Sequence, residues 1–158
     1  MKPVRMRAAA ATVGVAACGA VAVAALASPP SGFTPTNLVT EAEVPRRVHL
    51  NSDRITFKTK GPVDVRVQSV DIAPGGRSGW HHHPGLVFGA VQTGTVTFVD
   101  ASCDTTVYRA GSVFIESGDE PHEARNLTNQ PVTIYGTFIA PDADPGVFRI
   151  EDPVINCP

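Results

Sequence analysis

The residues best suited to chemistry lie in Trp80-His81-His82-His83-Pro84-Gly85, which places three imidazoles at consecutive positions. In an extended segment, side chains alternate between two sides, so His81 and His83 point one way and His82 points the other. Two imidazoles can bind one cation, but a transition metal in a protein generally needs a third ligand. The one histidine further along the chain is His122, so strand pairing would have to bring it beside the pair. A solvated histidine-rich loop is the alternative interpretation.

Glycines frame these histidines at fixed spacings. A first motif consists of Gly75, His81, His83, Val87 and Gly94. Five residues separate Gly75 from His81, three separate His83 from Val87, and six separate Val87 from Gly94. A second motif is formed by Gly111, Ser117, Asp119, His122 and Asn126. Together they resemble the two-motif signature of the cupin superfamily. Val87 stands where that signature has a glutamate ligand, and Ser117 and Asp119 stand where it has Pro and Gly.

The resemblance implies an all-β fold, an antiparallel double-stranded β-helix or jelly-roll barrel, with a divalent transition metal on His81, His83 and His122. Iron, zinc, manganese, nickel and copper all fit such a ligand set. Three neutral imidazoles would leave the ion its double charge, which favours an anionic small-molecule ligand. Two function classes stay open: a metal-dependent oxygenase, isomerase or hydrolase, and a non-catalytic module that binds or senses a metal or small ligand.

A carboxylate, Glu116, follows Phe114 and Ile115 on the strand expected to lead toward His122. Burial among apolar side chains would be costly for a carboxylate unless it is paired or bound to a metal. One interpretation turns Glu116 outward, to solvent or to an arginine. The other turns it inward, where it would replace the carboxylate missing at Val87 as a fourth ligand or would act as a general acid or base.

Short β-branched segments separated by Gly, Pro, Asn and Asp make up most of the chain, and no window has a sustained helical period. This pattern predicts an antiparallel barrel or sandwich. We expect strands near residues 47–50, 54–59, 63–72, 86–92, 95–100, 105–109, 112–116 and 132–139.

The chain begins with a basic segment and then an uncharged, alanine-rich run that ends at Ala25-Leu26-Ala27. This arrangement is typical of a secretory signal peptide, so we expect residues 1–27 to be removed and the protein to be secreted. A retained membrane anchor and a lipoprotein site at Cys18 are the alternatives. Residues 28–40 are rich in Pro and Ser and are expected to be flexible, which assigns the barrel to residues 41–158.

Two cysteines, Cys103 and Cys157, remain after residue 27. An even count in an exported protein predicts a disulfide, which would stabilise the fold by about 4 kcal/mol on the chain-entropy estimate. The same part of the chain has 10 Lys and Arg against 15 Asp and Glu residues. A mildly acidic chain without a basic run argues against nucleic acid as a partner. A small molecule is the expected partner, with no stable membrane span after processing, and homodimer formation stays open.

Overall fold

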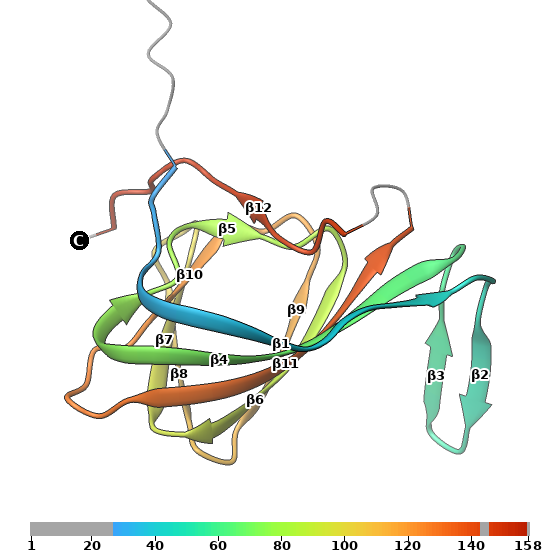
Figure 1. Cartoon of the computed structure of the whole chain (residues 1–158), viewed down its shortest axis with the longest axis horizontal. Helices are drawn as coiled ribbons and strands as arrows, with labels where there is room; N and C mark the ends of the chain where they lie inside the picture. Colours follow the sequence, from blue (N-terminus) through green and yellow to red (C-terminus); the bar gives the residue numbers. More distant parts are fainter. Residues whose placement is uncertain (1–26, 143–145, 158) are drawn as a thin grey trace, which may run out of the picture.

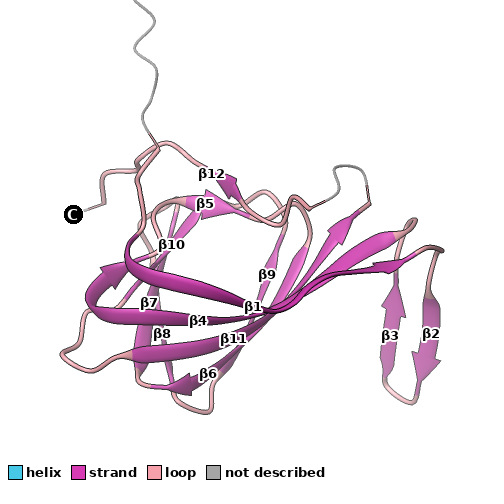
Figure 2. Cartoon of the chain, in the orientation of Figure 1, coloured by secondary structure: helices cyan, strands magenta, loops and turns pink. Residues whose placement is uncertain are grey.

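The structure is a computed structural model that describes residues 27–142 and 146–157, and every regular element in these ranges is a β-strand (Figure 2). The strands are β1 (Ser31–Val44), β2 (His49–Ser52), β3 (Ile55–Lys58), β4 (Val63–Arg77), β5 (His81–His82), β6 (Leu86–Thr93), β7 (Thr95–Asp100), β8 (Thr105–Arg109), β9 (Val113–Ser117), β10 (His122–Arg125), β11 (Val132–Pro141) and β12 (Ile150–Glu151). The expected signal peptide lies outside the described residues, apart from Ala27. No helix in the described part of the chain has the length and hydropathy of a membrane span.

Ten of these strands form one antiparallel sheet that curls into a nearly closed barrel (Figure 1). The main path of neighbours runs β12-β5-β10-β4-β11-β6-β9, while β1 pairs with β4 and β7 links β10 to β8. The long strands β4 and β11 pair over ten positions, from Val132↔Ile72 to Pro141↔Val63. Sheet closure of this kind confirms the all-β jelly-roll barrel.

A cluster of buried apolar side chains packs inside the barrel. Ile72, Val96 and Val132 are fully buried, and Phe114 packs against them at 7% exposure. Phe98 joins this cluster from the same face of β7 as Val96. Because the cluster occupies only part of the interior, the rest of the barrel is left for a cavity.

The glycines of the two motifs have a structural explanation in the turns. Gly94 joins β6 to β7 at φ 76°, and a Cβ there would lie 2.5 Å from the carbonyl oxygen of Pro131. Gly111 joins β8 to β9 at φ 86°. Both residues occupy the left-handed region that glycine adopts at little cost, so the turns that set the register of β7 and β9 depend on them.

The eight strand segments expected from the sequence all appear, with ends shifted by a few residues. The expectation of a flexible segment at residues 28–40 is wrong, because β1 covers residues 31–44 and pairs with β4. Its Pro35 is tolerated because β1 has β4 as its one strand neighbour in the described structure, so an edge position needs no donor from proline. Three short strands, β5, β10 and β12, were also not expected.

The hairpin of β2 and β3 forms a separate two-stranded sheet that stands to the side of the barrel (Figure 1). Residues 46–60 hold five of the ten Lys and Arg residues after residue 27 and one of the fifteen Asp and Glu residues. A net charge averaged over the whole chain conceals this basic arm.

Candidate metal centre

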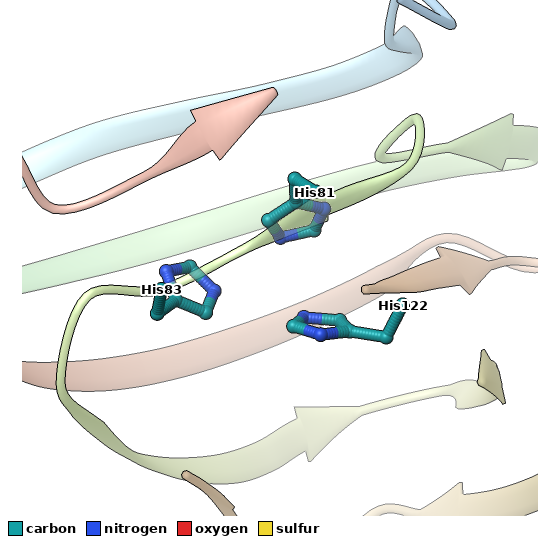
Figure 3. Close-up of side chains that lie close together, drawn as sticks. All are labelled: His81, His83 and His122. Carbon is teal, nitrogen blue, oxygen red and sulfur yellow. The ribbon is translucent and has the colours of Figure 1, made fainter. Parts of the chain in front are cut away.

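Three imidazoles, those of His81, His83 and His122, lie close together (Figure 3). His81 lies on β5, His83 lies directly after it, and His122 is the first residue of β10. Backbone pairing of His122 with His81 brings the two motifs together. One potential ligand atom from each of these residues lies within 4.8 Å of the others. Strand alternation therefore gathers the three histidines that the sequence singled out, while His82 points elsewhere and contacts Asp152 at 2.8 Å.

Each ring is held by a backbone carbonyl through its Nδ1 atom. Nδ1 of His81 is 2.9 Å from the oxygen of Gly79, and Nδ1 of His122 is 3.0 Å from that of Glu120. Nδ1 of His83 is 2.6 Å from the oxygen of Phe148. Carbonyl oxygens only accept hydrogen bonds, so all three Nδ1 atoms carry the proton when the rings are neutral. Neutral rings then present their three Nε2 lone pairs as the atoms that could bind an ion.

The electrostatics differ among the three rings. Burial lowers the pKa of His81, and the positive ends of His122 and Arg149 lower it further. Burial also lowers the pKa of His83, although the Glu116 carboxylate opposes the effect. At His122, burial again disfavours the charged form, but the hydrogen bond and charge of Glu116 outweigh it and raise the pKa. Two of the three rings are thus kept neutral by the protein itself, as metal ligation requires.

Glu116 turns inward and shares the space of the histidines. Its carboxylate oxygens lie 3.1 Å from Nε2 of His122 and 3.6 Å from Nε2 of His83. Val113, Ile115 and Ser117 of β9 are exposed, the first two at 65% and 63%, so alternation sends Glu116 to the interior. The side chain of Glu116 therefore faces inward, and its role as a ligand or as an acid or base stays a prediction.

Val87 lies directly opposite Glu116 in the register of β6 and β9. Its side chain is 2% exposed and lines the same cavity. Facing residues of an antiparallel pair have Cβ atoms about 5 Å apart. A carboxylate therefore lies on the neighbouring strand, directly across from the position where the first motif lacks one.

The histidines open into a cavity of about 160 Å³. Its polar lining outside the histidines and Glu116 consists of Arg66, Gln68, Ser78 and Arg149. Its apolar walls are Phe33, Pro35, Val70, Val87, Phe98, Phe114, Ala124, Ile134, Gly136, Phe138 and Phe148. A mostly apolar cavity with a few converging polar groups is the usual form of a small-molecule site.

The C-terminal segment (residues 146–157) closes one side of this cavity. Its strand β12 pairs with β5, so that Glu151 lies opposite His81 (Figure 1). Phe148 and Arg149 of the segment line the cavity. A disulfide between Cys103 and Cys157 fixes the end of the segment to the loop after β7. The expected pairing of these cysteines is thus present, and it anchors the wall that orients His83.

Two further residues of the motif region, Trp80 and Asn126, are buried and have structural roles. Trp80 is 1% exposed and belongs to the packed interior instead of the cavity lining. Asn126 is fully buried, and its Nδ2 donates to the carbonyl oxygens of Ile72, Ala73 and Gln130. These hydrogen bonds give Asn126 a structural role in the turn that follows β10.

Sequence reasoning missed the cavity residues Arg66, Phe148 and Arg149. Arg66 alternates with valines on β4, a pattern that normally assigns the charged side to solvent. Here Arg66, Gln68 and Val70 all line the cavity. The polar side chains of β4 face inward because the barrel interior contains a cavity instead of being filled by the core. In the sequence, the one signal for this is the presence of polar residues at every second position of a long strand.

Residues 68–138 match the family model described as "Cupin domain". No curated protein matches the chain. Among solved structures, the fold is similar to a Cupin_2 domain of an XRE family transcriptional regulator from Enterobacter cloacae, at 17% identity and a TM-score of 0.50 over 70% of this chain and 97% of that chain.

Two other similar structures differ more in extent. One is an uncharacterized conserved protein with a double-stranded beta-helix domain from Klebsiella pneumoniae, at 20% identity, covering 57% of this chain and 76% of that one with a TM-score of 0.49. The other is oxalate oxidase in complex with glycolate, at 25% identity, covering 46% of this chain and 40% of that one with a TM-score of 0.42. This chain therefore spans less than half of the oxalate oxidase chain.

Proposed function

We propose that the chain, whose residues 68–138 match a cupin domain model, binds one divalent transition metal ion through Nε2 of His81, His83 and His122. Glu116 is the fourth protein ligand in this proposal, in place of the carboxylate that the motif lacks at Val87. Four protein ligands of this kind leave positions for a small molecule, as a functional metal site requires.

The observation that supports the proposal most directly is the fixed orientation of the three rings. Backbone carbonyls at Gly79, Glu120 and Phe148 hold the Nδ1 protons. Partners of this kind orient metal-binding histidines and raise their basicity. A set of packed structural histidines would not need all three Nε2 atoms directed at one another.

The bound ion would supply a Lewis-acid centre in the cavity. The apolar walls would keep bulk water away from the ligand, which strengthens electrostatic contacts inside. Glu116 is the one carboxylate among the described residues that line this cavity. We assign to it any proton transfer at the site, so an enzymatic role for the chain depends on this residue.

We further propose that residues 1–27 direct export and that the metal site works outside the cytoplasm. Oxidising compartments are where structural disulfides persist, and the pair of Cys103 and Cys157 supports this location. Expression of the full chain, followed by N-terminal sequencing of the exported product, tests it. A product that still begins at Met1 would contradict it.

Metal analysis of protein purified without chelators tests the metal site. We expect about one transition metal ion per chain, and His122→Ala should lose most of it because the substitution removes one of the three imidazole ligands. His49→Ala is the matched control, since His49 is exposed on the separate hairpin. Full occupancy in the His122→Ala protein would overturn the assigned ligand set.

Glu116→Gln tests the fourth ligand separately, because the amide keeps the shape and removes the charge. We expect a metal affinity at least about tenfold lower, in line with losses on changing groups that support metal ligands. Unchanged affinity in a folded Glu116→Gln protein would leave a site of three histidines alone.

A further inference from the structure

The cavity beyond the histidines has a shape and lining of its own. Five phenylalanines contribute to its walls: Phe33, Phe98, Phe114, Phe138 and Phe148. Its volume of about 160 Å³ is close to that of an apolar protein cavity that holds one benzene molecule, roughly 150 Å³. A ligand that fills it therefore has an apolar body of about six carbon atoms.

Arg66 brings a positive charge to this apolar space. The side chain is half-buried on β4, and its guanidinium stacks 4.1 Å from the centre of the Phe148 ring. Nε donates to the carbonyl oxygen of Thr40 at 2.8 Å, and Nη2 approaches that of Gly146 at 3.4 Å. Both acceptors are neutral, and no carboxylate of the described residues lies within 4.0 Å of Arg66.

Arg149 also lines the cavity, but its surroundings are different. Its guanidinium binds both carboxylate oxygens of Glu151 and the carbonyl oxygen of Ser78. The charge of Arg149 is therefore already balanced by a neighbour on the same segment. Of the two guanidinium groups at the cavity, Arg66 is the one without a carboxylate partner among the described residues.

We propose that the cavity binds a small monocarboxylate with an aromatic or similarly sized apolar body, and that Arg66 binds the carboxylate. A partly desolvated cation is stabilised by an anionic partner, and the planar guanidinium matches a carboxylate with two parallel hydrogen bonds. Stacking on Phe148 and the hydrogen bond to Thr40 hold the guanidinium in place before the ligand arrives. The inference rests on the proposed function in that it places the ligand in the cavity of the metal centre.

Calorimetric titration with benzoate and with its neutral analogue benzamide tests this assignment on the folded wild-type protein, both metal-free and loaded with zinc. We expect benzoate to bind about 10- to 100-fold more tightly than benzamide, the range for hydrogen bonds to a charged group. Acetate, which lacks the apolar body, should bind more weakly than benzoate. Equal affinities for benzoate and benzamide would overturn the proposal without any variant.

Substitutions then test whether Arg66 carries the positive charge that binds the carboxylate. Arg66→Gln should remove the preference for benzoate over benzamide, whereas Arg66→Lys should retain part of it because the charge remains. Arg77→Gln is the control, since Arg77 is an exposed arginine of the same strand outside the cavity lining. Should Arg66→Gln fail to fold, Arg66→Lys decides the question: affinity equal to wild type would show that two parallel hydrogen bonds are not made.

The metal-free titration separates this inference from the metal proposal. Loss of benzoate preference in metal-free Arg66→Gln protein supports the carboxylate site whatever the metal analysis shows. A preference that survives in Arg66→Gln but disappears in His122→Gln would place the carboxylate on the histidines and overturn the role of Arg66. Normal metal content with no benzoate binding would overturn the carboxylate site alone.

Discussion

Replacing both cysteines by serine, Cys103→Ser with Cys157→Ser, should destabilise the protein in two measurable ways. The disulfide joins residues 54 positions apart, and the loss of chain entropy in the unfolded state on closing such a loop is worth about 4 kcal/mol at 25 °C. With a urea dependence of roughly 2 kcal/mol per molar for a protein of this size, the unfolding midpoint should fall by about 2 M. The fluorescence of Trp80, the one tryptophan and a fully buried one, reports the transition.

The second effect concerns the metal centre. The disulfide anchors the C-terminal segment, which supplies the Phe148 carbonyl to Nδ1 of His83. Loss of such a partner commonly costs 10- to 100-fold in metal affinity, so the double serine variant should bind zinc at least about tenfold more weakly. Reduction of the wild-type protein should reproduce both effects and leave the variant unchanged. A loss of stability below about 1 kcal/mol, or unaltered zinc affinity, would refute this account of the segment.

Three further substitutions test other parts of the structure. Val87→Glu should tighten metal binding, since position 87 faces Glu116 and the new side chain would add an anionic oxygen. Isothermal titration with zinc measures the affinity, and an unchanged value would mean that position 87 does not face the ion. Gly89→Ala should cost about 1–3 kcal/mol in thermal unfolding, because its Cβ would lie 1.9 Å from the Phe114 ring; a stable variant would mean that the ring moves freely. Asn126→Asp should cost about 3 kcal/mol, because it replaces a buried donor of three hydrogen bonds by an acceptor; stability equal to wild type would show that the bonds contribute little.

Much of the barrel was predictable because its long strands are bounded by turn residues. The glycines at positions 94 and 111, for example, end one strand and begin the next, and positive φ explains their presence. Strands β5 and β12 have two residues each, too few for a period of two to appear. Their existence depends on partners far away in the chain, so local pattern carries no signal for them.

The histidine ligands were predictable from spacing, but the surrounding site was only partly so. The direction of Glu116 could not be decided because Val113 and Ile115 are apolar although they face outward, which removes the usual contrast between the sides of a strand. Arg66 was missed for the opposite reason, since its side chain is polar and faces inward. A ligand cavity reverses the relation between polarity and burial that pattern reading relies on.

The facing arrangement of Val87 and Glu116 has a consequence for how such sites evolve. A carboxylate on either strand reaches the same space, so a second one could arise on β9 before the first was lost from β6. Every ancestor along that path would keep a carboxylate beside the three histidines. A sequence motif that requires an acidic residue at the position of Val87 would overlook proteins that carry the carboxylate on β9. A motif that accepts an acidic residue at either of the two facing positions would find them.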